Sequence, residues 1–115
     1  MRTKNCWQLW EKLPEYGEML YKRAIGKSEE MESAKSISKL ITKYYFPGMT
    51  ICDVGCGAGH YLLSFRKRID KNINYVGVDS TKYYIELARK AFNDRKIFVL
   101  GDIYKLPFKK IILIW

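Results

Sequence analysis

The spacing of apolar side chains changes character near residue 47. Before that point apolar residues recur at intervals of three and four, which is the pattern of amphipathic helices. The longest of these stripes consists of Met31, Ala34, Ile37, Leu40, Ile41 and Tyr44. We expect Pro14 to end one helix or open the next, Gly26 to end the second helix and Ser28 to cap the third. Pro47-Gly48 then breaks the chain, so the pattern predicts a helical segment over residues 1–47.

Beyond this break, short apolar runs alternate with amphipathic stretches. The expected strands cover residues 50–54, 73–78 and 97–100, and the expected helices cover residues 60–69 and 81–92. Strands that alternate with helices of this length are joined by right-handed crossovers into a parallel sheet. Residues 111–115 can add a fourth strand beside the first, in the order 3-2-1-4. We therefore expect an α/β fold in which residues 48–115 form a partial sheet domain.

Each expected strand ends in residues suited to binding a ligand. The first leads into Asp53 and the loop Gly55-Cys56-Gly57-Ala58-Gly59, the second ends at Asp79, and the third ends at Asp102. Ligands of open parallel sheets bind beyond the carboxyl ends of the strands. Glycines permit a tight turn and close backbone approach, and free N–H groups of the following helix favour a polar or anionic group. Asp79 stands where a carboxylate can accept hydrogen bonds from two ribose hydroxyls, so these residues predict a nucleoside pocket.

The spacing of the glycines narrows the choice of nucleoside. Dinucleotide-binding folds use GxGxxG, whereas this loop reads GxGxG and has His60 where the last glycine would stand. A nicotinamide-binding half domain is therefore disfavoured. The pattern suits a ligand with a ribose, an adenine and a charged amino-acid tail.

Three segments together resemble the class I S-adenosylmethionine-dependent methyltransferases. They are Asp53-Val54-Gly55-Cys56-Gly57-Ala58-Gly59, Val76-Gly77-Val78-Asp79-Ser80-Thr81 and Gly101-Asp102-Ile103-Tyr104-Lys105-Leu106-Pro107-Phe108. The resemblance covers residues 48–108, with the motifs in the family's order and spacing. It implies a Rossmann-like fold with S-adenosylmethionine as the cofactor.

The resemblance also implies roles for single residues. The implied cofactor-binding set is Asp53, Gly55, Cys56, Gly57, Ala58, Gly59, Asp79, Ser80, Asp102 and Ile103. In this family the glycine loop would contact the methionine part, with Asp53 supporting it, and Asp79 would hold the ribose. Ser80 would lie against the adenine, and Asp102 would accept from the adenine amino group with the Ile103 backbone alongside. The resemblance implies no catalytic residue.

The family also places an N-terminal helical segment over the cofactor. Residues 15–46 are open to that role, and Tyr16 and Tyr21 are candidates for contact, although no motif fixes either of them. Thr81 would cap the helix that follows Asp79.

The C-terminal end departs from the family pattern. After Leu106-Pro107-Phe108 the family continues with Phe-Asp, a fourth strand and about 80 to 150 further residues of a typical domain. This sequence has Lys109-Lys110 and then residues 111–115. We expect a truncated methyltransferase, or one half of a split enzyme, that keeps the cofactor side and leaves the methyl acceptor unknown. The apolar edge formed by residues 111–115 predicts self-association or pairing with a complementing chain.

The charge supports an alternative from another class. Lysine and arginine number 21 against 12 acids, a net charge of +9, and Arg66-Lys67-Arg68 is the densest basic cluster. A basic surface attracts nucleic acid. A non-catalytic nucleic-acid-binding module on the same scaffold therefore stays open beside the methyltransferase.

The cysteines and the apolar runs bear on compartment and metal binding. Cys6, Cys52 and Cys56 make neither an even disulfide set nor a CxxC pair, which favours a reducing, cytoplasmic setting. Cys52, Cys56 and His60 fall four residues apart, but they belong to a strand, a loop and a helix, so we expect no metal site. The longest uncharged apolar run, 111–115, is far shorter than the roughly 20 residues of a membrane span. The N-terminus shows no signal-peptide cleavage site, so we expect no secretion and no membrane partner.

Overall fold

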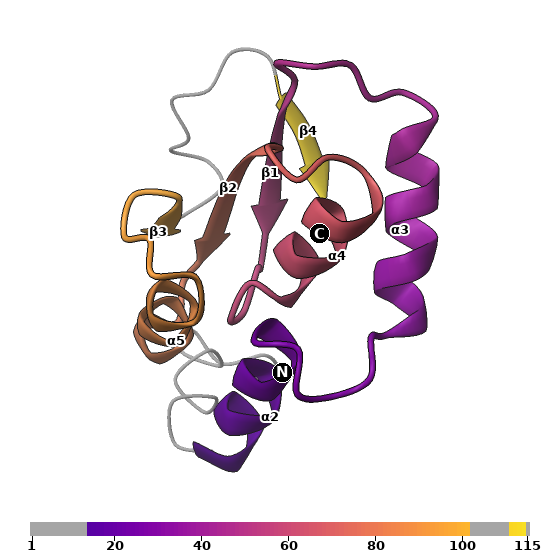
Figure 1. Cartoon of the computed structure of the whole chain (residues 1–115). Helices are drawn as coiled ribbons and strands as arrows, with labels where there is room; N and C mark the ends of the chain where they lie inside the picture. Colours follow the sequence, from indigo (N-terminus) through magenta and orange to yellow (C-terminus); the bar gives the residue numbers. More distant parts are fainter. Residues whose placement is uncertain (1–13, 102–110, 115) are drawn as a thin grey trace, which may run out of the picture.

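The computed structural model describes residues 14–101 and 111–114 (Figure 1). Its strands are β1 (Thr50–Val54), β2 (Asn74–Asp79), β3 (Phe98–Leu100) and β4 (Ile111–Ile114). Its helices are α2 (Pro14–Ala24), α3 (Glu32–Thr42), α4 (His60–Arg68) and α5 (Lys82–Phe92). The strands are parallel and lie in the order β3-β2-β1-β4. The expected α/β class with a parallel sheet is confirmed.

The register of the strands brings their carboxyl ends together. Asp53 of β1 lies opposite Gly77 of β2, and Asp79 at the end of β2 lies opposite Leu100 of β3. On the other side of β1, Asp53 lies opposite Ile114 of β4. The glycine loop after β1 and the turn after β2 therefore leave the sheet at the same edge.

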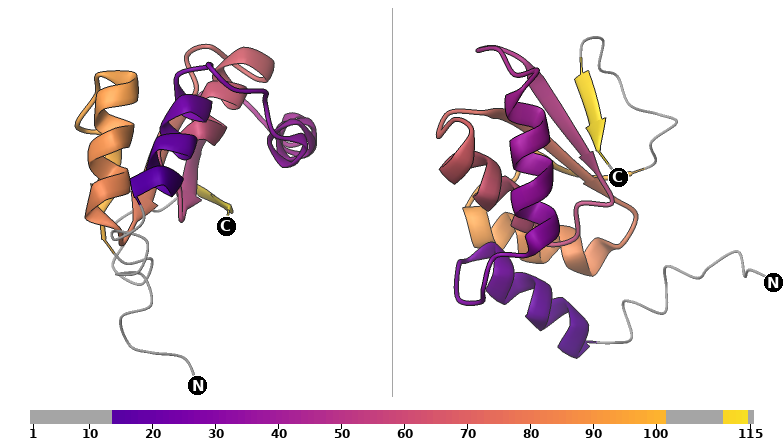
Figure 2. Two further views of the ribbon diagram at one scale, coloured as in Figure 1. Left: turned by 90° about the horizontal axis from the view of Figure 1, so that it is seen from below. Right: turned by 90° about the vertical axis from the view of Figure 1, so that its right-hand side faces the viewer.

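The helices of the described chain lie on one side of the sheet (Figure 2). Helices α4 and α5 are the crossovers between successive strands, α2 lies between them near the strand ends, and α3 packs on the outer side of α4. The core between this layer and the sheet includes Ile51, Leu62, Phe65, Tyr75, Ile85 and Phe98. Burial of such large apolar side chains is the main force that holds the crossovers on the sheet.

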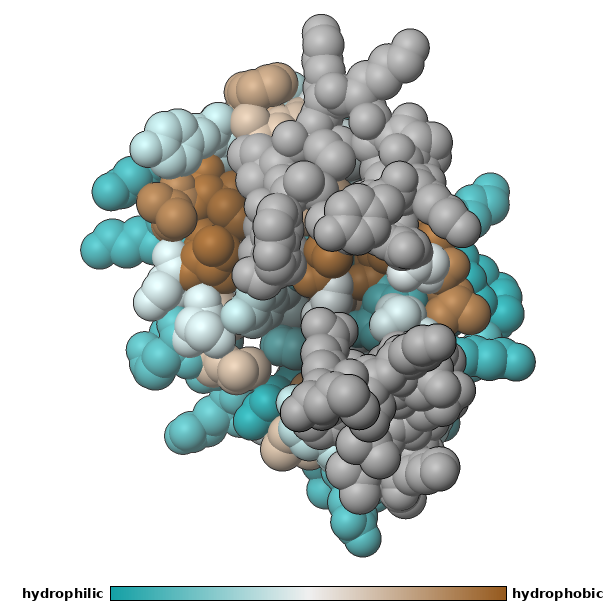
Figure 3. Space-filling view, turned by 180° about the vertical axis from the view of Figure 1, so that it is seen from behind, coloured by the Kyte–Doolittle hydropathy of each residue, from teal (hydrophilic) through white to brown (hydrophobic). Residues whose placement is uncertain are grey.

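The opposite face of the sheet is also apolar. Side chains alternate along a strand, so the residues that follow Ile51 and Tyr75 point away from the helical layer. The β-strand residues on this face are Cys52, Val54, Val76, Val78 and Val99. Figure 3 shows this side of the molecule, with apolar residues in brown. Strands that are apolar on both faces are typical of parallel sheets.

Most expected element boundaries are met within one residue, but the start of the third helix is wrong. Pro14 opens α2, and Gly26 ends it in a left-handed conformation with φ of 79°. Ser28, however, caps nothing: α3 begins at Glu32, after an extended Met31. The connection before α3 instead carries Glu30 to α4, where its carboxylate accepts hydrogen bonds from Arg68 Nε at 2.8 Å and Nη2 at 2.7 Å.

Within the described part of the chain, no helix has the length and apolar character needed to cross a membrane.

Candidate functional site

Asp79 joins three pieces of the sheet edge through its hydrogen bonds. Its Oδ2 accepts from the N–H of Gly57 at 2.9 Å, and its Oδ1 accepts from the N–H of Thr81 at 2.8 Å. Its backbone carbonyl accepts from the N–H of Gly101 at 3.1 Å. The half-buried carboxylate therefore links the glycine loop to the start of α5, and the backbone of the same residue reaches the end of β3. Thr81 occupies the N-cap position of α5, but its side chain makes no capping bond.

The glycine loop bends back onto β2. The N–H groups of Gly55 and Cys56 both donate to the Val78 carbonyl, at 2.7 Å and 3.1 Å. Gly55, Gly57 and Gly59 have φ angles of 76°, 57° and 86°, in the left-handed region that L side chains rarely adopt. The backbone conformation by itself therefore requires glycine at each of these three positions.

The three glycines differ in the space around them. A Cβ on Gly59 would lie 2.8 Å from Phe98 and 2.9 Å from Phe92, so this glycine lets the loop pack against the core. A Cβ on Gly57 would lie 3.2 Å from Leu20 of α2. A Cβ on Gly55 would meet no atom of residues 14–101 within 4 Å. Of the three, Gly55 is the position where a ligand has room to approach the backbone.

The other two residues of the loop point inward. Cys56 and Ala58 are buried, and burial raises the pKa of the Cys56 thiol well above its usual value. The Cys56 thiol lies 3.4 Å from the carbonyl oxygen of Gly57. Any contact that these residues make with a ligand would come from their backbone.

Asp53 lies inside the protein, close to this edge. Its side chain is only 3% exposed, and Tyr75 Oη donates a hydrogen bond to its Oδ2 at 2.7 Å. Burial raises the pKa of Asp53 to about 7; the Tyr75 hydrogen bond acts to lower it, and the charge of Asp79 to raise it. The two acids are therefore close enough to interact electrostatically. The structure gives Asp53 a contact with Tyr75, and shows no hydrogen bond from Asp53 to the loop among the described residues.

Sequence reasoning missed two residues that fit Asp53 into this place. The hydrogen bond from the Tyr75 hydroxyl offsets part of the free-energy cost of burying the acid, because a buried carboxylate needs a hydrogen-bond donor. Gly77 leaves room for this arrangement, since a Cβ there would lie 3.0 Å from Tyr75 Oη and 2.9 Å from Cys56 Sγ. The glycine inside a strand was the available signal, because such a glycine often marks a close approach.

Tyr84, in the first turn of α5, brings an unsatisfied hydroxyl to the same edge. Its Oη is buried and has no hydrogen-bond partner within the described part of the chain. Burial raises the pKa of Tyr84 to about 12, with further contributions from Tyr16 and Asp79. The rings of Tyr84 and Tyr16 are 6.1 Å apart. Sequence reasoning missed a role for Tyr84 at this edge, although it stands only three residues after Thr81.

Helix α2 covers part of the glycine loop. Leu20 is 5% exposed and packs with Ala24, Ala58 and Tyr84. Tyr16, on the same helix, faces Tyr84, whereas the ring of Tyr21 lies 5.3 Å from Lys90 Nζ on α5. Of the two tyrosines proposed for the cofactor, Tyr16 is the one that lies beside Tyr84.

The remaining residues of the implied set are Ser80, Asp102 and Ile103. Ser80 follows Asp79 and is exposed. Asp102 and Ile103 lie outside the described residues. Cys52 and Cys56 are free, buried thiols. Within residues 14–101, no group of three or more His, Cys, Asp or Glu side chains is arranged to hold a metal ion.

Comparisons with known sequences identify the chain's relatives. A family model described as a methyltransferase domain matches residues 46–113. The carboxy-S-adenosyl-L-methionine synthase of Campylobacter lari is 34% identical over 83 residues, covering 69% of this chain and 35% of that protein. An uncharacterised methyltransferase of Schizosaccharomyces pombe is 28% identical over 94 residues, covering 73% of this chain and 34% of that protein. The chain thus spans about a third of the length of these two relatives.

Solved structures share the fold. The plantazolicin methyltransferase BpumL, in complex with a monoazolic desmethylPZN analogue and SAH, has a TM-score of 0.56 at 24% identity, over 85% of this chain and 36% of that one. DesVI of Streptomyces venezuelae has a TM-score of 0.56 at 21% identity, over 91% of this chain and 41% of that one. Together with the family match over residues 46–113, these findings show that the chain belongs to the class I S-adenosylmethionine-dependent methyltransferase domain family.

Proposed function

We propose that this chain binds S-adenosylmethionine at the carboxyl ends of β1 and β2 and serves as the donor-binding part of a methyltransferase. The observation that carries the proposal is the Asp79 carboxylate, which holds the N–H of Gly57 and the N–H of Thr81 at once. This contact joins the two motifs that the family uses for the cofactor. As part of the same proposal, residues 48–115 form the partial cofactor-binding domain and residues 1–47 the helical segment.

Three features of the edge fit an adenosyl ligand. A carboxylate has about four lone-pair sites, so Asp79 can accept ribose hydroxyls beside its two backbone donors. Gly55 offers an exposed backbone with open space where its Cβ would be. The unpartnered hydroxyl of Tyr84 supplies a further polar group near Asp79. Ser80, Asp102 and Ile103 complete the proposed adenine contacts.

The bound cofactor supplies a methyl group on a positively charged sulfur. Transfer to a nucleophile then depends mainly on alignment, and a base is needed only where the acceptor must lose a proton. The proposed task of this chain is alignment: Asp79 fixes the ribose, while the glycine loop fixes the amino-acid end. Asp53, buried beneath the loop with Tyr75, would add negative charge below the site when ionised. We assign no catalytic residue and no acceptor.

A calorimetric titration of S-adenosylhomocysteine into the full 115-residue chain tests the proposal. Wild type should bind, and Asp79→Ala should weaken binding about a hundredfold or more, because it removes both the ribose partner and the anchor of the loop. Asp94→Ala is the matched control. Asp94 Oδ1 also accepts an N–H two residues onward, from Lys96 at 2.9 Å, but in a turn away from this edge. Thermal unfolding of both variants separates lost binding from lost folding.

One observation favours a second candidate function, non-catalytic binding of nucleic acid. The lining of an open hollow of about 570 Å³ includes Lys35 and Lys39 of α3, Lys43 directly after this helix, and Arg68. Lysines four residues apart share one face of a helix and could follow a phosphate backbone. If wild type gives no heat with S-adenosylhomocysteine but retains RNA in a salt-sensitive manner, the second function is supported and the first is contradicted.

A further inference from the structure

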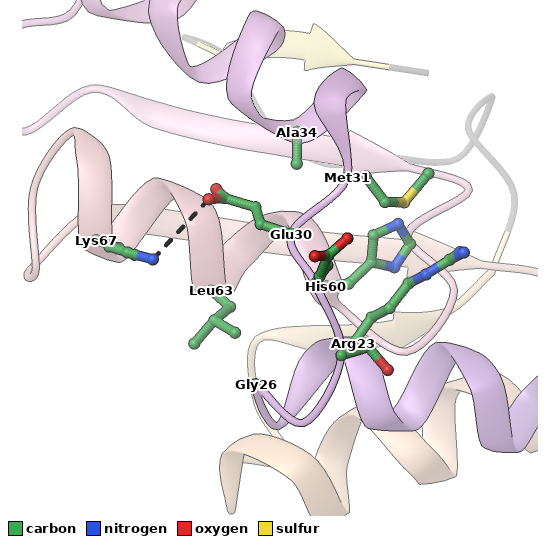
Figure 4. A pocket seen from close by; sticks show the side chains of 10 residues that line it. Arg23, Gly26, Glu30, Met31, Ala34, His60, Leu63 and Lys67 are labelled. Carbon is green, nitrogen blue, oxygen red and sulfur yellow. Dashed lines mark ion pairs between the residues drawn. The ribbon is translucent and has the colours of Figure 1, made fainter.

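A second polar site lies between α2, the connection that follows it, and α4. There a cavity of about 110 Å³ is lined by residues that include Arg23, Glu29, Glu30, His60, Leu63 and Lys67 (Figure 4). Neither the glycine loop nor residues 79–81 contribute to the described lining of this cavity. It is therefore distinct from the edge that carries Asp79.

His60 presents an unsatisfied ring to this cavity. Its Nδ1 is buried and has no hydrogen-bond partner among the residues that the structure describes. Burial lowers the pKa of His60 to about 4, and the charge of Arg23 adds to this effect, so the ring is neutral at neutral pH. A neutral imidazole carries its proton on one of its two nitrogens, so Nδ1 can either donate a hydrogen bond to a ligand or accept one. The unpartnered Nδ1 is the atom of this ring that is available to a ligand.

Arg23 brings a second unsatisfied group. In Figure 4 the His60 ring is seen between Met31 and Arg23. Arg23 is half-buried, and its guanidinium forms no ion pair within the described residues. A guanidinium carries donors in a planar fork that matches a carboxylate or a phosphate.

The acids that line the cavity do not neutralise Arg23. The carboxylate of Glu30 is held by Arg68 at 2.7 Å and lies 3.9 Å from Lys67 Nζ. The hydrogen bond from Arg68 is the main reason that the pKa of Glu30 falls to about 2. Glu29 is exposed, where solvent screens its charge. With Arg68 included, three cations surround two carboxylates, which leaves one positive charge in excess.

We propose that this cavity binds an anionic oxygen group, a carboxylate or a phosphate, held by the Arg23 guanidinium and the His60 Nδ1–H. With a volume of about 110 Å³, the cavity has room for such a group. The rest of the ligand would project through the opening.

The cavity adjoins the donor site through His60. A Cβ on Gly57 would lie 3.8 Å from His60 Cε1, so one wall of the cavity touches the glycine loop. Resting on the proposed function, this places the anionic group of the methyl acceptor beside the donor and makes the acceptor an acidic small molecule.

The single histidine of the chain makes a direct test feasible, because its ring gives one set of NMR signals. Sodium acetate and inorganic phosphate are titrated separately into the full-length chain at constant ionic strength. Each should shift the His60 signals saturably, in the millimolar range expected for so small a ligand. A response to phosphate alone would assign the site to phosphate esters, and a response to acetate alone to carboxylic acids; either supports the proposal.

Variants separate the Arg23–His60 site from general charge effects. Arg23→Gln should weaken anion binding about tenfold or more, and Arg23→Lys should weaken it less, because charge remains while the fork is lost. Arg95→Gln removes the same charge from an exposed turn and should leave binding unchanged. No saturable shift in wild type, or equal loss in Arg23→Gln and Arg95→Gln, would overturn the proposal.

Asp79→Ala distinguishes this proposal from the proposed function. The variant should no longer bind S-adenosylhomocysteine but should still bind the anion. The two titrations are independent, so a failure of the cofactor titration leaves the result of the anion titration unaffected. If S-adenosylhomocysteine displaces acetate, and Arg23→Gln weakens both ligands equally, the cavity belongs to the donor site and the idea of a separate anion subsite is wrong.

Discussion

The strand-end edge around Asp79 and the cavity around His60 differ in how their polar groups are satisfied. At the edge, Asp79 already accepts from Gly57 and Thr81, and Asp53 accepts from Tyr75. In the cavity, His60 Nδ1 has no partner and Arg23 has no ion pair within the described residues. Apart from the Tyr84 hydroxyl, these polar side chains at the edge have hydrogen-bond partners, so the edge can hold its shape without a ligand. A bound ligand would stabilise the cavity more than the edge, because an unsatisfied buried polar group costs about 1 to 3 kcal/mol.

Substitutions of the loop glycines test this comparison within the edge itself. We expect them to have the largest effect on the free energy of unfolding. Gly59→Ala should lower the free energy of unfolding by about 2 to 4 kcal/mol, because its Cβ would overlap Phe98 and Phe92 in a left-handed backbone. Gly55→Ala should lower the free energy of unfolding by only about 1 to 2 kcal/mol, from backbone strain alone. It should also weaken the binding of S-adenosylhomocysteine. Urea unfolding and calorimetry measure the two quantities.

Gly48→Ala is the control for both variants. Its φ is 91° and a Cβ there would meet nothing within 4 Å, so it carries the strain of Gly55→Ala without proximity to the edge. If Gly55→Ala and Gly48→Ala bind the cofactor equally well, the open backbone at Gly55 is not a ligand contact.

The buried acid beneath the loop should give a smaller, pH-dependent effect. The pKa of Asp53 is about 7 in the folded protein and 3.8 as its ordinary value, so the folded state holds the proton more tightly. Between these values the unfolded state binds fewer protons, and the free energy of unfolding therefore falls as pH rises from about 4 to 7, then levels off. The contribution of Asp53 to the free energy of unfolding is therefore fully present below its ordinary pKa of 3.8.

Comparing wild type with Asp53→Asn isolates this contribution. The difference in free energy of unfolding, wild type minus variant, should be larger at pH 5 than at pH 8 by about 1 to 3 kcal/mol. Urea unfolding at the two pH values measures it. A difference that stays constant, or grows with pH, would show that Asp53 is ionised throughout and is stabilised by its surroundings.

The weakest expected effect concerns the far edge of the sheet. β4 pairs with β1, and no further strand lies beside it in the described part of the chain. An unpaired parallel edge is a template for another chain, so we expect the protein to self-associate at tens of micromolar. Sedimentation velocity over that range checks this, and a clean monomer at every concentration would contradict it.

The sequence was most informative where a motif is local. β1, the glycine loop and Asp79 follow from an apolar run, a glycine repeat and an acid at a strand end, each fixed by neighbouring residues. Ser28 misled because Glu30 pairs with Arg68, 38 residues away, and residues 27–31 serve that contact instead of starting a helix. Tertiary contacts of this kind override local capping preference.

The roles of single residues followed the same division. That Gly59 must be glycine for packing depends on Phe98, a residue on a different strand. The cavity combines Arg23, Glu30 and His60 from three separate elements, and no spacing in the sequence relates them. Asp102 and Ile103, which were predicted for the adenine, lie outside the described residues and stay predictions.

An NMR titration of the uniformly ¹⁵N-labelled chain with S-adenosylhomocysteine tests the central claim most directly, since it reports each backbone N–H separately. We predict saturable shifts that are largest at the amides of Gly55, Gly57 and Thr81, around the Asp79 carboxylate. If those amides remain unmoved while the ligand binds elsewhere or not at all, the assignment of the cofactor to the ends of β1 and β2 is contradicted.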